Sequence, residues 1–134
     1  MYTYNTQIRI RYSETDRMGY CYYGNYAQFF EIGRVETLRS LGISYKELED
    51  QGIMLPVLDY QVRFLKPAYY DDLLTSKTTI SQLPAARILF DYEIFNENNI
   101  LISTAQTTLV FIQDKTMKPC MAPQHLLDKI KQFF

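Results

Sequence analysis

Two acidic residues shortly before an expected helix carry the clearest chemical signal in this chain. Glu14 and Asp16 follow a strand-like run, and a helix is expected to begin at Asn25 after a short aromatic, glycine-containing loop. The first turn of a helix has backbone N–H groups without intrahelical partners. A carboxylate beside such donors combines a base with groups that stabilise an oxyanion. This pairing suits the attack of water on a carbonyl group.

The helix that would supply the backbone N–H donors is predicted over residues 25–41. Its apolar face comprises Tyr26, Phe29, Phe30, Gly33 and Leu41. Asn25, with Gln28 three residues later, is typical of an N-cap and its reciprocal partner, and Gly42 suits the C-terminal stop. A glycine inside a helix costs about 1 kcal/mol relative to alanine. Gly33 therefore predicts a close approach to another backbone segment.

Most of the remaining chain has the alternating pattern of β-strands. Strands are predicted at 4–12, 58–64, 74–80, 88–94 and 100–112, a short helix at 44–51 and a last helix after Pro123. One long helix set against five mostly antiparallel strands predicts an α+β fold in which a sheet wraps around the helix. The length of 134 residues fits one domain spanning 1–134.

Composition excludes several function classes. The net charge of −1 gives no electrostatic reason to expect nucleic-acid binding. No segment approaches the ~20 apolar residues of a membrane helix, and the alternating N-terminus does not resemble a signal peptide. Cys21 and Cys120 are too few for a disulfide framework and have no metal-type spacing. We therefore expect free thiols in a cytoplasmic protein.

Several blocks of the sequence resemble the hotdog-fold acyl-CoA thioesterases of the 4-hydroxybenzoyl-CoA thioesterase type. The matching blocks are RYSETDRMGYCYYGNYAQFFEIGR at 11–34, LPV at 55–57, PAYYDD at 67–72 and the Ala86-Arg87 strand start. The resemblance runs from about residue 7 to Pro123. It implies hydrolysis of a thioester between an acyl group and coenzyme A, or a carrier-protein pantetheine, without a metal or organic cofactor. It also implies a homodimer or homotetramer with the active site at a subunit interface.

The resemblance assigns roles to particular residues. Its catalytic carboxylate corresponds to Asp16, acting as a general base or as a nucleophile, and its oxyanion donors correspond to the backbone N–H groups of Tyr23 and Gly24. Many relatives have histidine where this chain has Tyr23, but a backbone role is compatible with tyrosine. The candidates for substrate binding are Tyr20, Tyr22, Asn25 and Tyr26 around the acyl group, and Arg63, Lys66 and Arg87 for the coenzyme A phosphates.

Each candidate also has a structural interpretation. Asp16 is also typical of a turn aspartate that caps backbone groups, and the tyrosines are equally typical of core packing. Glu14 is expected to be a solvated acid at the end of a strand. Glu31, on the central helix, is the competing catalytic carboxylate, but an ion pair with Arg34 is favoured. The single histidine, His125, is expected at the surface.

Two other functions compete with thioester hydrolysis. A non-catalytic acyl-CoA or acyl-carrier binding protein on the same fold would keep the pocket aromatics without needing Asp16. A hotdog hydratase or dehydratase commonly pairs an acid with a histidine, and no histidine lies near the motif. A serine hydrolase is disfavoured because the chain has no G-x-S-x-G sequence.

Overall fold

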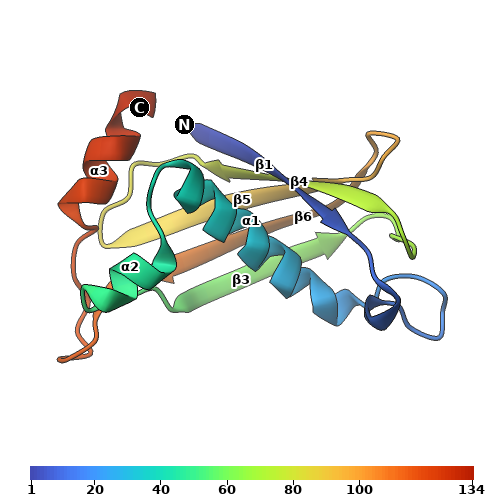
Figure 1. Ribbon diagram of the computed structural model, residues 1–134, viewed down its shortest axis with the longest axis horizontal. Coiled ribbons are helices and arrows are strands. Elements are labelled where there is room, and N and C mark those ends of the chain that lie inside the picture. Colours follow the sequence, from blue (N-terminus) through green and yellow to red (C-terminus); the bar gives the residue numbers. More distant parts are fainter.

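The computed structural model describes residues 1–134 and has an α+β fold, as predicted (Figure 1). A five-stranded antiparallel sheet curves around the long helix α1 (Tyr26–Ser40). The strand order is β1-β4-β5-β6-β3. The strands are β1 (Tyr2–Arg9), β3 (Val57–Phe64), β4 (Leu73–Ile80), β5 (Arg87–Phe95) and β6 (Leu101–Val110). Strand β1 ends earlier than expected, because residues 12–14 form a 3₁₀ turn.

The core lies between α1 and the concave face of the sheet. Alternate side chains of β5 are buried there, as its period predicts: Ile88, Phe90, Tyr92 and Ile94. Phe29 and Phe30 of α1 are also fully buried, with exposed fractions of 1% and 0%. The opposite, outer face of the sheet is largely polar, and carries the Lys77–Glu93 ion pair.

Gly33 lies where α1 comes closest to the sheet. A methyl group at this position would lie 2.6 Å from the Thr78 Oγ1 atom and 3.0 Å from the Ser76 Oγ atom of β4. A close approach is thus observed, but it is to side-chain hydroxyls of a strand and not to the backbone segment that was predicted. This contact fixes the distance of α1 from the sheet.

We expect Gly33→Ala to lower the free energy of unfolding by about 1 kcal/mol, because overpacking costs about 1–3 kcal/mol and exceeds the gain in helix propensity. Chemical denaturation measures the change. Adding Thr78→Ala, which removes the obstructing hydroxyl, should recover part of the loss, with Thr78→Ala alone as the control. A Gly33→Ala protein as stable as the parent would show that the helix has room to move.

The smaller elements lie at the end of the sheet away from the start of α1 (Figure 1). Helix α2 (Tyr45–Asp50) begins as predicted, with the Ser44 hydroxyl accepting the Glu47 N–H at 3.1 Å. Helix α3 (Gln124–Ile130) follows Pro123, also as predicted. Two-residue strands β2 (Ile53–Met54) and β7 (Ile112–Gln113) form a separate small sheet that the sequence did not predict.

Strand β3 forms one open edge of the main sheet. It pairs only with β6. Its large apolar side chains are exposed, with fractions of 40–54% for Val57, Leu58, Tyr60 and Phe64. The edge therefore has both unpaired backbone groups and uncovered apolar surface.

Both cysteines are free thiols, as predicted. No helix is long and apolar enough to cross a membrane.

Candidate active site

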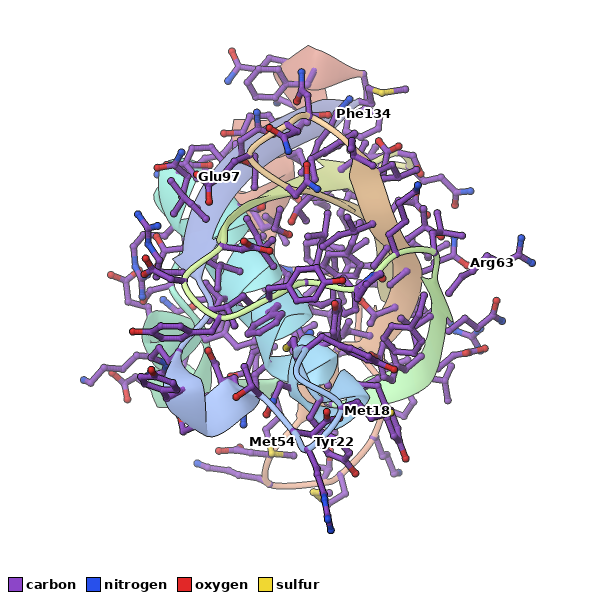
Figure 2. The ribbon with its side chains drawn as sticks, turned by 90° about the vertical axis from the view of Figure 1, so that its right-hand side faces the viewer. Met18, Tyr22, Met54, Arg63, Glu97 and Phe134 are labelled. Carbon is purple, nitrogen blue, oxygen red and sulfur yellow. The ribbon has the colours of Figure 1, made fainter.

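A cleft of about 410 Å³ opens where the start of α1 meets the C-terminal end of β3. It is lined by Asp16, Met18, Tyr20, Cys21, Tyr23, Tyr26, Phe64, Leu65, Lys66 and Pro67. In Figure 2, the labelled Met18 and Tyr22 lie together at this end of the molecule, beside the start of α1. Five of the site residues predicted from the sequence therefore line this cleft: Asp16, Tyr20, Tyr23, Tyr26 and Lys66.

Asp16 is held by a tight turn that leaves half of its carboxylate free. Its Oδ1 atom accepts the Met18 N–H at 2.8 Å. Its carbonyl oxygen accepts the Gly19 N–H at 3.0 Å, and Gly19 has φ +89°, which favours glycine. Asp16 is therefore a turn aspartate, as the structural interpretation proposed. The Oδ2 atom has no partner within the chain, so it remains available to a molecule in the cleft.

Two backbone donors at the helix start are also free. Tyr22 is extended, and residues 23–25 form a 3₁₀ turn that runs directly into α1. The Asn25 N–H donates to the Tyr22 carbonyl at 3.0 Å, whereas the N–H groups of Tyr23 and Gly24 have no partner within the chain. Such groups concentrate the positive end of the helix dipole. The arrangement can therefore stabilise an oxyanion.

Gly24 leaves room for the ring of Tyr22. A Cβ atom at this position would lie 2.5 Å from the Tyr22 Cε2 atom. The Tyr22 ring lies 4.8 Å from that of Tyr23. Gly24 thus lets the Tyr22 ring lie across the helix start.

The prediction that Asn25 caps α1 is wrong. Asn25 already has helical dihedral angles, because the 3₁₀ turn begins the helical segment two residues earlier. Its Nδ2 atom instead donates to the Glu14 carbonyl at 2.8 Å. The same carbonyl accepts the Tyr22 N–H at 2.8 Å. Asn25 therefore ties the acidic segment to the helix start.

The prediction that Glu14 is solvated is also wrong. Its side chain is buried, with 5% of the residue exposed. It accepts the Arg11 N–H at 2.8 Å and the Arg11 guanidinium at 3.1 Å. Residues 12–14 form a 3₁₀ turn and not the end of the predicted strand. Glu14 stabilises the loop that carries Asp16.

The tyrosines of the motif divide between the cleft and its rim. Tyr26 is 3% exposed and lies edge-on to Phe64, with ring centroids 5.0 Å apart. Burial raises the pKa of its phenol, so the group is neutral. Tyr20 lines the cleft and donates to the Met18 Sδ atom at 3.2 Å. Tyr22 and Tyr23 are exposed at the opening.

The three basic candidates are not brought together in one chain. Lys66 is exposed and lines the cleft. Figure 2 shows Arg63 extending from the side of the molecule, away from Met18 and Tyr22. Arg87 pairs with Val110 at the far end of β5, whereas the cleft end lies near Ile94. At ~3.3 Å per residue, Arg87 and Ile94 are roughly 23 Å apart along the strand.

The predicted ion pair between Glu31 and Arg34 does not form. Arg34 is 9% exposed, and its Nε atom donates to the Tyr45 hydroxyl at 3.2 Å. It lies on the core-facing side of α1, whereas Glu31 points to solvent and has no ion-pair partner. Glu31 does not line the cleft. His125 is half-buried on α3, also outside the cleft.

Cys21 is a lining residue that sequence reasoning did not nominate for the site. It is 3% exposed, and its position between Tyr20 and Tyr22 in the motif was the available signal. Burial, together with the charge of Glu14, raises the pKa of the thiol to about 11. The thiol is therefore protonated near neutral pH and does not supply a nucleophile. No three His, Cys, Asp or Glu side chains cluster to hold a metal ion.

We expect Cys21 to resist alkylation in the native protein. With a pKa of about 11, roughly one thiol in a thousand is ionised at pH 8. Iodoacetamide at pH 8 should leave Cys21 unmodified, as read by peptide mass spectrometry, and should modify it after unfolding. Rapid native alkylation of Cys21 would show that the thiol is activated.

Comparison with known proteins agrees with the fold. Residues 10–130 match the family model of the thioesterase-like superfamily. The acyl-CoA thioester hydrolase YbgC of Escherichia coli O6:H1 is 30% identical over 125 residues, 93% of each chain. The 1,4-dihydroxy-2-naphthoyl-CoA hydrolase of Thermosynechococcus vestitus is 28% identical, covering 80% of this chain and 74% of the relative. The structure of a DHNA-CoA thioesterase from Staphylococcus aureus superposes with a TM-score of 0.91 at 38% identity, covering 99% of this chain and 89% of that one.

The family match and the named relatives identify a thioester hydrolase with a hotdog fold. The chain belongs to the thioesterase-like superfamily. The predictions of a hotdog fold and of a thioester hydrolase are confirmed at this level.

Proposed function

We propose that the cleft hydrolyses acyl-CoA thioesters, with Asp16 as the catalytic carboxylate and the N–H groups of Tyr23 and Gly24 as the oxyanion hole. One observation carries this proposal: Asp16, with a carboxylate oxygen that has no partner, and Tyr23, with a backbone N–H that has no partner, line the same cleft, and the second free N–H belongs to the next residue, Gly24. The thioester carbonyl would lie between them, with its oxygen toward the helix start.

The proposed groups are sufficient for this reaction. A thioester is already an activated acyl group, so it needs a base, polarisation of the carbonyl and correct positioning. General-base assistance contributes ~10²–10⁴-fold, and one oxyanion donor contributes ~10²–10³-fold. Asp16 either takes a proton from water or attacks the carbonyl itself. An acyl group on the Asp16 peptide, trapped by rapid quench and seen by mass spectrometry, would identify the nucleophilic route.

Within the superfamily, we place the chain in the 4-hydroxybenzoyl-CoA thioesterase type, on the motif at 11–34. The acyl group would contact the cleft aromatics Tyr20, Tyr26 and Phe64, and Lys66 would meet the phosphates of coenzyme A or of a carrier-protein pantetheine. Arg63 and Arg87 would reach the phosphates of a substrate held by another subunit, since neither lies at the cleft of its own chain.

We further propose a homodimer, alone or within a homotetramer, built from single-domain chains spanning 1–134. The open β3 edge supports the assembly, because an exposed apolar edge strand is a template for another strand. The two free thiols support a cytoplasmic location.

A thiol-release assay with short, medium, long and aromatic acyl-CoA substrates tests the proposed activity. A rate of thiol release that is proportional to the enzyme concentration would support the proposed activity. Acyl-CoA binding by calorimetry without thiol release would instead favour the non-catalytic binding protein. Hydration of an enoyl-CoA without thiol release would favour the hydratase.

A further inference from the structure

One buried charge in the chain has no counter-charge. Glu14 and Arg34 are the two charged residues among those that are buried. Glu14 is paired with Arg11, whereas Arg34 forms no ion pair with any acid of the chain. Buried charges in proteins are normally paired, because an isolated charge loses its hydration without compensation. An anion that pairs with Arg34 must therefore come from outside the chain.

The phenols around Arg34 do not supply this negative charge. The Arg34 Nε atom donates to the Tyr45 hydroxyl at 3.2 Å. Tyr92 is the second phenol beside the guanidinium, and its hydroxyl is hydrogen-bonded to Thr107 at 2.6 Å. Burial raises the pKa of Tyr45 and raises the pKa of Tyr92 to about 12, so both phenols are neutral near pH 7. The surroundings of the guanidinium are thus polar but carry no opposite charge.

The terminal nitrogens of the guanidinium are open to a ligand. Nη1 and Nη2 of Arg34 have no hydrogen-bond partner within the chain. Fully enclosed side-chain atoms without a partner occur in Thr6, Ser76 and Thr78, and no nitrogen of Arg34 is among them. The two nitrogens therefore reach the surface, although Arg34 as a whole is only 9% exposed. A guanidinium presents two parallel N–H donors, which match the two oxygens of a carboxylate.

Arg34 also lies on the face of α1 that leads away from the cleft. Tyr26, Phe30 and Arg34 are spaced four residues apart and are all buried, so their side chains follow one another along one side of the helix. Tyr26 lines the cleft. A rise of ~1.5 Å per residue places Arg34 ~12 Å further along the helix axis. The row therefore runs from the proposed acyl site to the unpaired guanidinium.

Two rings of β3 lie beside this row. The Phe64 ring lies 5.0 Å from that of Tyr26, and the Tyr60 ring lies 6.1 Å from that of Phe30, between centroids. Phe64 and Tyr60 are both exposed, with fractions of 45% and 40%. The surface between α1 and β3 is therefore apolar and uncovered in the chain, and an acyl group that enters the cleft can lie along it.

We propose that Arg34 binds the terminal carboxylate of a dicarboxylic acyl group whose thioester carbonyl lies at the helix start. The position of the thioester rests on the proposed function. With C–C bonds of ~1.5 Å, eight carbons in a zigzag span about 9 Å. A carboxylate–guanidinium hydrogen bond of ~2.8 Å covers the remaining distance. Arg34 thus sets the preference for the acyl group and does not touch the reacting carbonyl.

A matched pair of ligands tests this proposal by binding alone. Octanoyl-CoA ends in a methyl group and octanedioyl-CoA ends in a carboxylate, and the Asp16→Asn protein binds both with little turnover. Calorimetry measures each Kd. Adding Arg34→Met should weaken the binding of octanedioyl-CoA by ~10–100-fold, the effect of removing a hydrogen-bond partner from a charged group. The binding of octanoyl-CoA should change little.

Two further variants control the measurement. Arg39→Met removes another arginine of α1, which is exposed and paired with Glu36, and should leave both affinities unchanged. Replacement of a buried charge by an apolar side chain is often neutral or stabilising, so Arg34→Met should fold, and thermal unfolding checks this. Arg34→Lys is the alternative if it does not fold, because lysine keeps the charge but lacks the planar pair of donors. It too should weaken octanedioyl-CoA binding selectively.

The outcomes separate this inference from the proposed function. An equal loss of affinity for both ligands on replacement of Arg34, or no loss for either, would overturn the carboxylate site and leave thioester hydrolysis intact. Failure of the parent chain to bind or hydrolyse any acyl-CoA would instead overturn the proposed function.

Discussion

The Asp16→Asn protein should fold and hydrolyse acyl-CoA with kcat lowered by ~10²–10⁴-fold, the contribution typical of general-base catalysis. The fold should survive because an asparagine Oδ1 atom can still accept the Met18 N–H that Asp16 accepts at 2.8 Å. The lost function would be that of the free Oδ2 atom, which becomes an amide. Thiol release under saturating substrate measures kcat, and circular dichroism with thermal unfolding checks the fold.

Glu31→Gln is the matched control for this experiment. It removes the competing carboxylate from α1, where Glu31 is exposed and outside the cleft. Its kcat should stay near the parent value. A large loss in Glu31→Gln with none in Asp16→Asn would move the catalytic role to the helix.

Tyr23→Pro should lower kcat by ~10²–10³-fold relative to Tyr23→Ala, the effect of one oxyanion donor. Both changes remove the ring, but only proline removes the backbone N–H. Proline suits the first position of a helical turn, and the preceding residue, Tyr22, has the extended ψ of 129° that proline requires. Because the Tyr23 N–H has no partner within the chain, its loss breaks no intrachain hydrogen bond.

The comparison between the two Tyr23 variants isolates the donor. If both have the same kcat, then the amide of residue 23 does not stabilise the transition state. A parallel loss in both variants would indicate that the ring at the cleft opening matters instead. Matching thermal midpoints would exclude a difference in folding.

The helices and strands could be predicted because each buries one of its faces, and this burial gives a periodic pattern of apolar residues in the sequence. The alternation of Ile88, Phe90, Tyr92 and Ile94 reflects a strand with one face in the core. The glycine at 33 pointed to a close contact for a similar reason, since only a packing constraint compensates its cost in a helix. The two-residue strands β2 and β7 are too short for any period, so they could not be predicted.

The errors at the site arose where a side chain had two possible partners. Asn25 has the residue type of an N-cap, but its amide reaches a carbonyl eleven positions earlier in the chain. Glu14 follows a strand-like pattern, but a 3₁₀ turn folds it back onto Arg11. Spacing in the sequence identifies the hydrogen-bond partners that a side chain can reach locally. Which partner the side chain takes depends on the conformation of the loop, and only the folded structure shows that conformation.

The positions of the basic residues also required the structure. Arg63 and Lys66 are three positions apart in sequence, yet one lies on the outer side of the sheet edge and the other lines the cleft. Arg87 lies far from Lys66 because the strand register places it at the end of β5 away from the cleft. Predicting which basic residues lie close together requires the order and register of the strands, and the periodicity of the sequence does not give these.

Strand β3 carries two exposed charged residues, Asp59 and Arg63, which affect how the chain avoids aggregation. Amyloid-like fibrils stack identical segments, commonly parallel and in register. In such a stack Asp59 would lie above Asp59 and Arg63 above Arg63, so both rows would repel. Charged side chains on an exposed edge are a common protection against this kind of growth. The charges of β3 thus penalise an unlimited parallel array.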